Sequence, residues 1–260
     1  MRFVLFITVL AAAVMGVAAP SWAITNGYAD HGAHPQVGAL LSDQPNDDGT
    51  WAFCTGTLIS PTVLLTAAHC GPDLKTARVS FSSHYEPGDK VYTGRYVADD
   101  RYDAESHLHD IAVVIFSRAV PNIRPARLPS AGMLDRLNTG GDLKTSEFTP
   151  VGFGAVNSGD GTDGTDGAQL TYTDTRHRTS ISFKALGKVW LELTPDASSG
   201  EGGTCYGDSG GPNFLGGSAS DLLVATTISG ADDACAATNF DYRLDTAPAR
   251  GFIGRFVTLP

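Results

Sequence analysis

CYGDSGGP, at residues 205–212, surrounds a single serine, Ser209, with glycines. Glycine has no Cβ atom, so a chain of this composition can turn sharply and bring its backbone N–H groups close to another group. Such N–H groups stabilise the negative charge that develops on a carbonyl oxygen under nucleophilic attack. The stretch therefore has the composition that an oxyanion hole requires.

Two other stretches contain the partners that a nucleophilic serine needs. TAAHC, at residues 66–70, contains His69, and HDIAVV, at residues 109–114, contains Asp110. A serine hydroxyl is a weak nucleophile unless a histidine takes its proton, and the histidine needs a buried carboxylate to fix its tautomer and stabilise the imidazolium. The three stretches supply one residue of each kind.

The order of these residues along the chain separates the possible enzyme classes. GDSGG also fits the Gly-x-Ser-x-Gly turn of α/β-hydrolases, but those enzymes place the histidine after the serine, and all seven histidines here precede Ser209. A subtilisin-like order needs an aspartate before His69, and no catalytic strand is indicated around the candidates Asp30, Asp43, Asp47 and Asp48. Asp110 is better placed because an apolar run follows it. His107 and His109 lie in a polar turn, where we expect solvated side chains.

Composition and patterning indicate an all-β chain. The 260 residues include 42% apolar residues, 30 Gly and 14 Pro, which is enough apolar material for a core and excludes intrinsic disorder. Short apolar runs bounded by turn residues predict strands, here near residues 37–41, 57–59, 63–67, 79–81, 111–116, 148–151, 189–193 and 222–228. The best helix candidate is residues 247–256, with Thr246 as the N-cap.

Residues 1–23 are typical of a secretory signal peptide. Arg2 precedes an apolar run from Phe3 to Ala19, and Ser21 and Ala23 form a small-x-small cleavage site. The run is short for a membrane-spanning helix, which needs about 20 residues. We therefore predict a secreted, extracellular protein with a mature domain at residues 24–260 and no membrane association after cleavage.

Four cysteines follow this segment, at positions 54, 70, 205 and 235. An even number in an oxidising compartment predicts two disulfides, with three possible pairings. Pairing of Cys54 with Cys70 and of Cys205 with Cys235 is preferred because it closes the shorter loops. A zinc site is disfavoured, because no Cys-x-x-Cys spacing is present and the nearest histidine, His69, directly precedes Cys70. We expect no metal and no cofactor.

Charge narrows the range of partners. With 28 acidic and 18 basic residues the formal net charge is −10, and no basic cluster is present, so nucleic acid is not an expected partner. NSGDGTDGTDG, at residues 157–167, is rich in Asp, but its spacing does not match the twelve-residue calcium loop. We interpret it as a flexible surface loop.

Taken in order, these motifs resemble the trypsin-like serine proteases, most of all secreted bacterial members. The resemblance covers nearly the whole mature chain: ITNG from Ile24, TAAHC, the Asp-Ile-Ala-Val run, VGFG at 151–154, GDSGGP and the segment around Tyr242. It implies two packed six-stranded antiparallel β-barrels. It also implies His69 as general base, Asp110 as its orienting carboxylate and Ser209 as nucleophile, with the N–H groups of Gly207 and Ser209 as oxyanion hole.

The same resemblance implies an activation pair and a substrate pocket. Cleavage before Ile24 would free an ammonium group that pairs with Asp208. The pocket would be formed by Gly203, Ile228 and Phe240; with glycine at its floor it would accept neutral or apolar side chains at P1, the substrate residue before the cleaved bond. A one-residue slip would instead direct Asp241 into the pocket and favour basic residues. A further hydroxyl to the triad aspartate would come from Thr226 or Thr227.

Two hypotheses of function follow. The first is a monomeric, secreted serine endopeptidase that acts on protein or peptide substrates. The second is a catalytically silent homologue that serves as an extracellular binding module, because function depends on the site and not on the scaffold. The complete set of triad and oxyanion residues favours the first.

Overall fold

The first barrel forms where the short apolar runs alternate with turns in the first half of the chain. The computed structural model describes residues 22–24, 26–157 and 170–260, and all element bounds below refer to these. Six antiparallel strands close in the order β3-β4-β5-β8-β7-β6. They are β3 (Val37–Leu41), β4 (Ala52–Ser60), β5 (Val63–Thr66), β6 (Thr76–Ser80), β7 (Val91–Ala98) and β8 (Ala112–Phe116).

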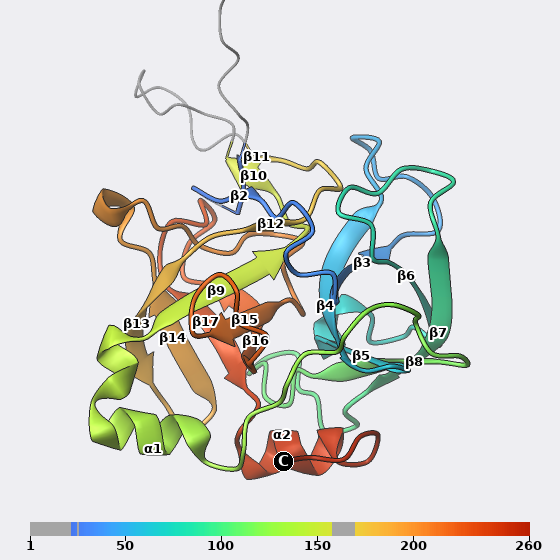
Figure 1. Cartoon of the computed structure of the whole chain (residues 1–260). Helices are drawn as coiled ribbons and strands as arrows, with labels where there is room; N and C mark the ends of the chain where they lie inside the picture. Colours follow the sequence, from blue (N-terminus) through green and yellow to red (C-terminus); the bar gives the residue numbers. More distant parts are fainter. Residues whose placement is uncertain (1–21, 25, 158–169) are drawn as a thin grey trace, which may run out of the picture.

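The second barrel follows in the second half of the chain (Figure 1). Its strands run in the order β13-β14-β17-β16-β15-β9, and antiparallel pairing of β9 with β13 closes the ring. They are β9 (Glu147–Gly152), β13 (Ile181–Leu186), β14 (Trp190–Thr194), β15 (Pro212–Leu215), β16 (Leu223–Gly230) and β17 (Asn239–Arg243). The prediction of two six-stranded barrels is confirmed.

Five short strands among the described residues lie outside the two barrels. β12 (His177–Arg178) pairs with β9 and with β2 (Tyr28–Ala29). A separate three-stranded sheet contains β1 (Trp22–Ala23), β10 (Val156–Asn157) and β11 (Leu170–Thr171). Most of the expected signal peptide and of the Asp-rich stretch lies outside the described residues.

Two short helices complete the described chain. α2 (Ala247–Ile253) is the expected C-terminal helix, but it ends three residues earlier than predicted, and Thr246 at its N-cap makes no side-chain capping bond. α1 (Met133–Gly140) was not predicted from the sequence. Three 3₁₀ turns are η1 (Ala68–Cys70), η2 (Asp142–Thr145) and η3 (Ala197–Ser199). None of the described helices has the length and apolar character required to cross a membrane.

A buried ionic contact and an apolar layer join the two barrels. Arg176, directly before β12, donates from Nε to Asp30 at 3.0 Å and from one terminal nitrogen to the carbonyl oxygen of Val37 in β3 at 2.9 Å. Around it, apolar residues of both barrels pack into one cluster that includes Leu65, Val151 and Phe214. Polar and apolar contacts therefore both join the barrels, and the candidate site lies on loops at this junction.

Candidate active site

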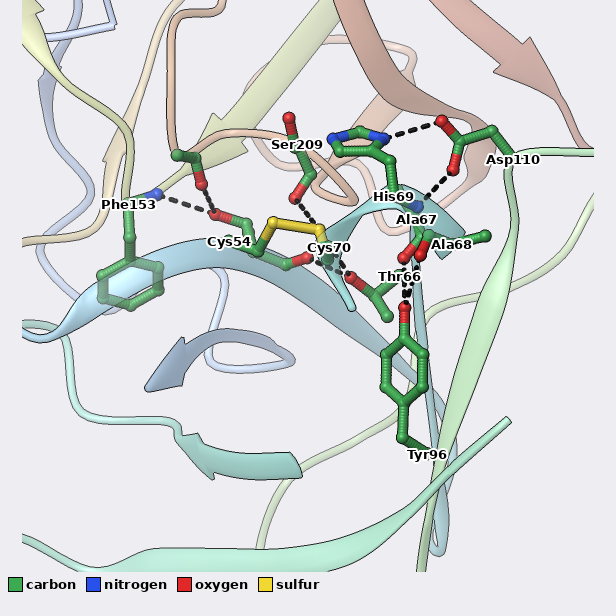
Figure 2. Close-up of a disulfide and its surroundings, with 12 residues drawn as sticks. Cys54, Thr66, Ala67, Ala68, His69, Cys70, Tyr96, Asp110, Phe153 and Ser209 are labelled. Carbon is green, nitrogen blue, oxygen red and sulfur yellow. Dashed lines mark hydrogen bonds and ion pairs between the residues drawn. A yellow bond between two sulfur atoms is a disulfide. The ribbon is translucent and has the colours of Figure 1, made fainter. Parts of the chain in front are cut away.

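His69 lies in η1, the turn that directly follows β5 of the first barrel. The buried hydroxyl of Tyr96 donates to the carbonyl oxygen of Ala67 at 2.6 Å and also lies 3.2 Å from that of Ala68 (Figure 2). Burial raises the pKa of Tyr96 strongly, so its hydroxyl stays protonated as a donor. A side chain of β7 thus holds the turn that carries His69 in place.

Asp110 is fully buried directly before β8, and both of its oxygens face His69. Oδ1 accepts a hydrogen bond from the backbone N–H of His69 at 2.9 Å, and Oδ2 lies 2.6 Å from its Nδ1 (Figure 2). A carboxylate can only accept hydrogen bonds, so this contact assigns the hydrogen to Nδ1 of the neutral imidazole. Nε2, on the other side of the ring, is left as a proton acceptor.

Ser209 reaches the same place from the second barrel, in the loop before β15. Figure 2 shows the His69 ring lying between Ser209 and Asp110. The backbone of Thr55 in β4 donates to the carbonyl oxygen of Ser209 at 2.9 Å, which connects the two barrels at the serine. The neighbouring Gly210 has φ +81°, and a Cβ atom there would lie 2.4 Å from the Thr55 carbonyl oxygen. Glycine is therefore required for this close approach.

The backbone before Ser209 has the geometry of an anion site. Gly207 has φ +96°, a conformation that glycine adopts without strain. Within the described part of the chain, the N–H groups of Gly207 and Ser209 donate no hydrogen bond to the protein. Both donors are therefore free to bind an oxygen that carries developing negative charge.

Asp208 lies behind this loop in a tight cradle. Its carboxylate accepts from the N–H groups of Gly154 and Cys205, each at 2.8 Å. A Cβ atom on Gly154 would lie 2.5 Å from the carboxyl carbon, so glycine is needed there too. Burial raises the pKa of Asp208 to about 7, although the two N–H groups partly offset this. None of the described cationic side chains forms an ion pair with Asp208.

Two cavities open beside Ser209. The larger, about 620 Å³, is lined by the first disulfide and by Asn46, Asp47, Asp48, Ala52, Phe53, His69, Tyr172, Tyr206, Gly207 and Ser209. The smaller, about 340 Å³, is lined by His69, Thr204, Cys205, Tyr206, Ser209, Thr227, Ile228, Ser229, Gly230, Asp232, Asp233 and Cys235. The smaller cavity lies between the loop that contains Ser209 and strand β16, which is the position expected for a substrate pocket.

The lining of the smaller cavity differs in part from the predicted pocket. Ile228 lines it as expected, whereas Gly203 and Phe240 are not among its lining residues. Thr204, next to Gly203, lines it instead, and its hydroxyl accepts from Asn239 Nδ2 at 2.6 Å. The alternative register is not seen either, because Asp241 is completely buried and its Oδ1 accepts from Asn213 in β15.

The surroundings of Asp110 also differ from expectation. Thr227 Oγ1 accepts from Asn213 at 3.1 Å, and the buried hydroxyl of Thr226 has no partner in the described part of the chain, so neither threonine bonds to Asp110. His107, expected to be solvated, instead places its Nδ1 3.5 Å from Asp110 Oδ2. Its half-exposed ring meets that of His69 edge to face, with centroids 6.3 Å apart. The sequence around His107 is that of a polar turn, and nothing in it indicated that His107 would contact Asp110.

Both disulfides border the site. The structure joins Cys54 to Cys70 and Cys205 to Cys235, the pairing preferred on loop length. His69 and the first pair are the one group of possible metal ligands found among the described residues, but the two sulfurs are bonded to each other. Thiolates, which bind zinc, are thus not available there.

Comparisons with known proteins agree with this arrangement. The trypsin family model matches residues 26–247. Among curated relatives, a collagenase of Hypoderma lineatum is 30% identical over 80% of this chain and 78% of its own, and a chymotrypsin of Phaedon cochleariae is 30% identical over 74% and 69%. Human kallikrein-15 is 31% identical over 63% of this chain and 67% of its own.

The solved structure of HL collagenase superimposes with a TM-score of 0.65 at 23% identity, covering 89% of this chain and 97% of the other, which supports the fold. The relatives named here come from animals, so they do not support the bacterial affinity expected from the motifs. The family match, the barrels and the motif order lead to one conclusion: the chain belongs to the trypsin family of serine endopeptidases.

Proposed function

We propose that this protein is a secreted endopeptidase that hydrolyses peptide bonds through an acyl-enzyme at Ser209. Ser209 Oγ attacks the carbonyl carbon while His69 Nε2 takes its proton, and Asp110 stabilises the imidazolium that forms. The N–H groups of Gly207 and Ser209 bind the resulting oxyanion. His69 then returns the proton to the leaving amine, and water, activated by the same histidine, hydrolyses the ester.

The observation that carries this proposal is the contact between His69 and Asp110. A fully buried carboxylate 2.6 Å from Nδ1, with a second bond to the backbone of the same histidine, holds the ring in one orientation and one tautomer. The ring then presents Nε2 to the serine. His69 also lines both cavities, which a histidine with a purely structural role would not need to do.

Three substitutions test the roles. Ser209→Ala, His69→Ala and Asp110→Asn are each expected to lower kcat by about 10⁴- to 10⁶-fold while the protein stays folded, because triad members act as a unit. Steady-state hydrolysis of a peptide ester and amide, with circular dichroism for folding, measures this. His84→Ala, at an exposed histidine outside the site, is the matched control and is expected to retain full activity.

A fluorophosphonate probe separates the two hypotheses of function. The probe requires an activated serine, so the endopeptidase is labelled at Ser209 and Ser209→Ala is not. Absence of labelling in the mature protein would favour the silent binding module. A His69→Ala variant that keeps a tenth of the turnover would contradict the triad.

We further propose a neutral P1 preference. The buried lining residues Thr204, Thr227 and Ile228 carry no charge. The two exposed carboxylates of the lining already have partners: Asp232 accepts from the N–H groups of Ala236 and Ala237, and Asp233 from Tyr206. A peptide-library cleavage profile tests this, and efficient cleavage after Arg or Lys would contradict it.

A further inference from the structure

Tyr206 forms the partition between the two cavities at Ser209. Of all the lining residues, just three belong to both cavities: His69, Ser209 and Tyr206. His69 and Ser209 are the reacting groups of the proposed mechanism, which leaves Tyr206 as the side chain that divides the space around them. Its ring is 49% exposed, unusual for a large aromatic side chain in this protein.

This exposed ring is nevertheless held at both ends. The backbone carbonyl oxygen of Tyr206 accepts from the N–H of Ala155 at 2.7 Å, which anchors the main chain. The hydroxyl donates to Asp233 Oδ1 at 2.9 Å. Asp233 belongs to the loop between β16 and β17, which lines the same cavity. The Tyr206 side chain therefore connects two of the segments that form the cavity walls.

The hydrogen bond lies directly beside a covalent link between the same two segments. The disulfide joins Cys205, which precedes Tyr206, to Cys235, two residues after Asp233. The disulfide fixes the distance between the walls, whereas the hydrogen bond can open and close without changing it. Tyr206 and Asp233 thus form a reversible connection across a cavity of constant width.

The connection lies at the mouth of the smaller cavity and not at its base. Thr204, Thr227 and Ile228 are at most 5% exposed and form the depth, whereas Tyr206 and Asp233 are exposed and form the rim. A volume of about 340 Å³ lies within the range of sites that enclose small ligands. The interior is large enough for a sizeable side chain, so the rim limits what enters.

Asp233 also affects the ionisation of the Tyr206 hydroxyl. The hydrogen bond to Asp233 and its negative charge raise the pKa of Tyr206, with a smaller contribution of the same sign from Asp232 and Tyr172. The phenol therefore stays protonated and able to donate. A hydrogen bond to an ionised acceptor is also stronger than one between neutral groups.

We propose that Tyr206 and Asp233 form a latch across the mouth of the P1 pocket, and that this latch selects narrow P1 side chains over wide aromatic ones. The proposal rests on the proposed endopeptidase function, for which it names the residue that limits P1. Narrow side chains pass beneath the closed latch. Binding of Phe or Trp at P1 requires the hydrogen bond between the Tyr206 hydroxyl and Asp233 to break. The free energy needed to break it weakens the binding of these substrates.

The test uses peptides that differ only at P1, with Ala, Leu, Phe or Trp, assayed on the mature enzyme. Tyr206→Phe keeps the ring and removes the donor, and Asp233→Ala removes the acceptor. In both variants the kcat/KM ratio of Trp to Ala is expected to rise about 3- to 10-fold, as for the loss of one exposed hydrogen bond. The change is expected in KM, because the triad is untouched.

Two further variants distinguish a latch from a general effect on the loop. Asp233→Asn keeps an acceptor oxygen but removes the charge, so its Trp to Ala ratio is expected to lie between those of the wild type and Asp233→Ala. Tyr28→Phe removes the hydroxyl of another exposed tyrosine, which lines neither cavity, and serves as the matched control, with an unchanged Trp to Ala ratio.

Fluorophosphonate labelling of every variant separates the possible failures. Full labelling with an unchanged Trp to Ala ratio in both Tyr206→Phe and Asp233→Ala overturns the latch and leaves the endopeptidase standing. Absence of labelling in the wild type overturns the endopeptidase and the latch with it. An equal gain for all four substrates also overturns the latch, because it indicates general loosening of the loop.

Discussion

Two aspartates, Asp110 and Asp241, are completely buried near the active site, but their surroundings differ at the level of single hydrogen bonds. Both oxygens of Asp110 face hydrogen-bond donors of His69. Asp241 accepts from Asn213 through Oδ1, and its Oδ2 has no partner among the described residues. Burial raises the pKa of Asp241 well above its ordinary value, although bonds from Asn213 and Thr227 act in the opposite direction.

This difference predicts a pH-dependent stability that Asp241→Asn removes. A carboxyl whose pKa is raised by folding holds its proton in the folded protein at pH values where the unfolded chain has lost it. Its contribution to stability is therefore largest below about pH 4 and declines as the pH rises towards the folded pKa. Relative to wild type, Asp241→Asn is expected to gain stability as the pH rises above about 4 towards the raised pKa of Asp241, by up to ~1.4 kcal/mol per pH unit.

Urea unfolding of both proteins across this pH range measures the effect. Both are prepared in a Ser209→Ala background so that neither digests itself. Asp208, whose pKa is also raised by burial, is present in both proteins and cancels in the comparison. Parallel pH profiles for the two proteins would contradict the prediction.

At the scale of elements, the site depends on loops rather than on the strands that carry them. η1 holds His69 because Tyr96 of β7 bonds to its turn, and the loop before β15 holds Ser209 because glycines allow it to pack against β4. The two disulfides fix these loops to neighbouring segments. Cys54–Cys70 links β4 to η1, and Cys205–Cys235 links the nucleophile loop to the turn before β17.

Removal of either disulfide is expected to cost about 2 to 5 kcal/mol of unfolding free energy. The second bridge spans 30 residues and the first 16, so its loss is expected to cost about 0.6 kcal/mol more by the chain-entropy relation. Paired Cys→Ser variants in the Ser209→Ala background, compared by urea unfolding, measure the difference. A larger loss from the shorter loop would indicate that native contacts, and not loop closure, dominate.

At the scale of the whole molecule, two residues far apart in sequence, Ile24 and Asp208, are both buried. In the intact chain the side chain of Ile24 is buried and its nitrogen is part of a peptide bond to Ala23. The carboxyl group of Asp208 is buried with two N–H donors and with no cation among the described residues. We propose that cleavage after Ala23 supplies that cation as the Ile24 ammonium, so that secretion and activation are one event.

This proposal predicts that a single extra residue abolishes activity. A form that retains Met before Ile24 is expected to fold but to be nearly inactive, whereas the form that starts at Ile24 is active. Removal of one partner of a buried ion pair lowers the free energy of unfolding by about 3 to 5 kcal/mol. Asp208→Asn in the mature form therefore tests whether the ammonium group depends on Asp208. Fluorophosphonate titration counts active sites in each form.

The pH dependence of the mature form provides a second measurement. An ammonium group paired with Asp208 keeps its proton to higher pH than an ordinary α-amino group, near 8. The stabilising contribution of this ion pair is therefore present at neutral pH and is lost as the pH rises through the raised pKa of the ammonium group. N-terminal sequencing of the secreted enzyme gives the decisive result: a fully active protein that starts several residues before Ile24 would refute the mechanism.

Features that depend on local chemistry could be predicted from the amino-acid sequence. Short apolar runs between turn residues predicted β3, β5 and β8 almost to the residue, because strands that are buried along nearly their whole length have continuous apolar sequences. β7 was missed because its exposed and buried residues mix without an apolar run. α1 was missed because just one of its residues is buried, which leaves little apolar pattern. Motif order, together with the resemblance to trypsin-like proteases, predicted Asp110 as the partner of His69.

The tertiary structure alone decided which distant side chains share a surface. His107 was expected in solvent and is half-exposed beside Asp110. Either Thr226 or Thr227 was expected to bond to Asp110, and neither does so among the described residues. Tyr206 meets Asp233 across 27 positions of sequence. Such contacts arise from how two barrels and their loops pack, and no local periodicity encodes them. Motifs therefore indicate the chemistry of this protein, whereas contacts between remote segments depend on the packing of the folded chain.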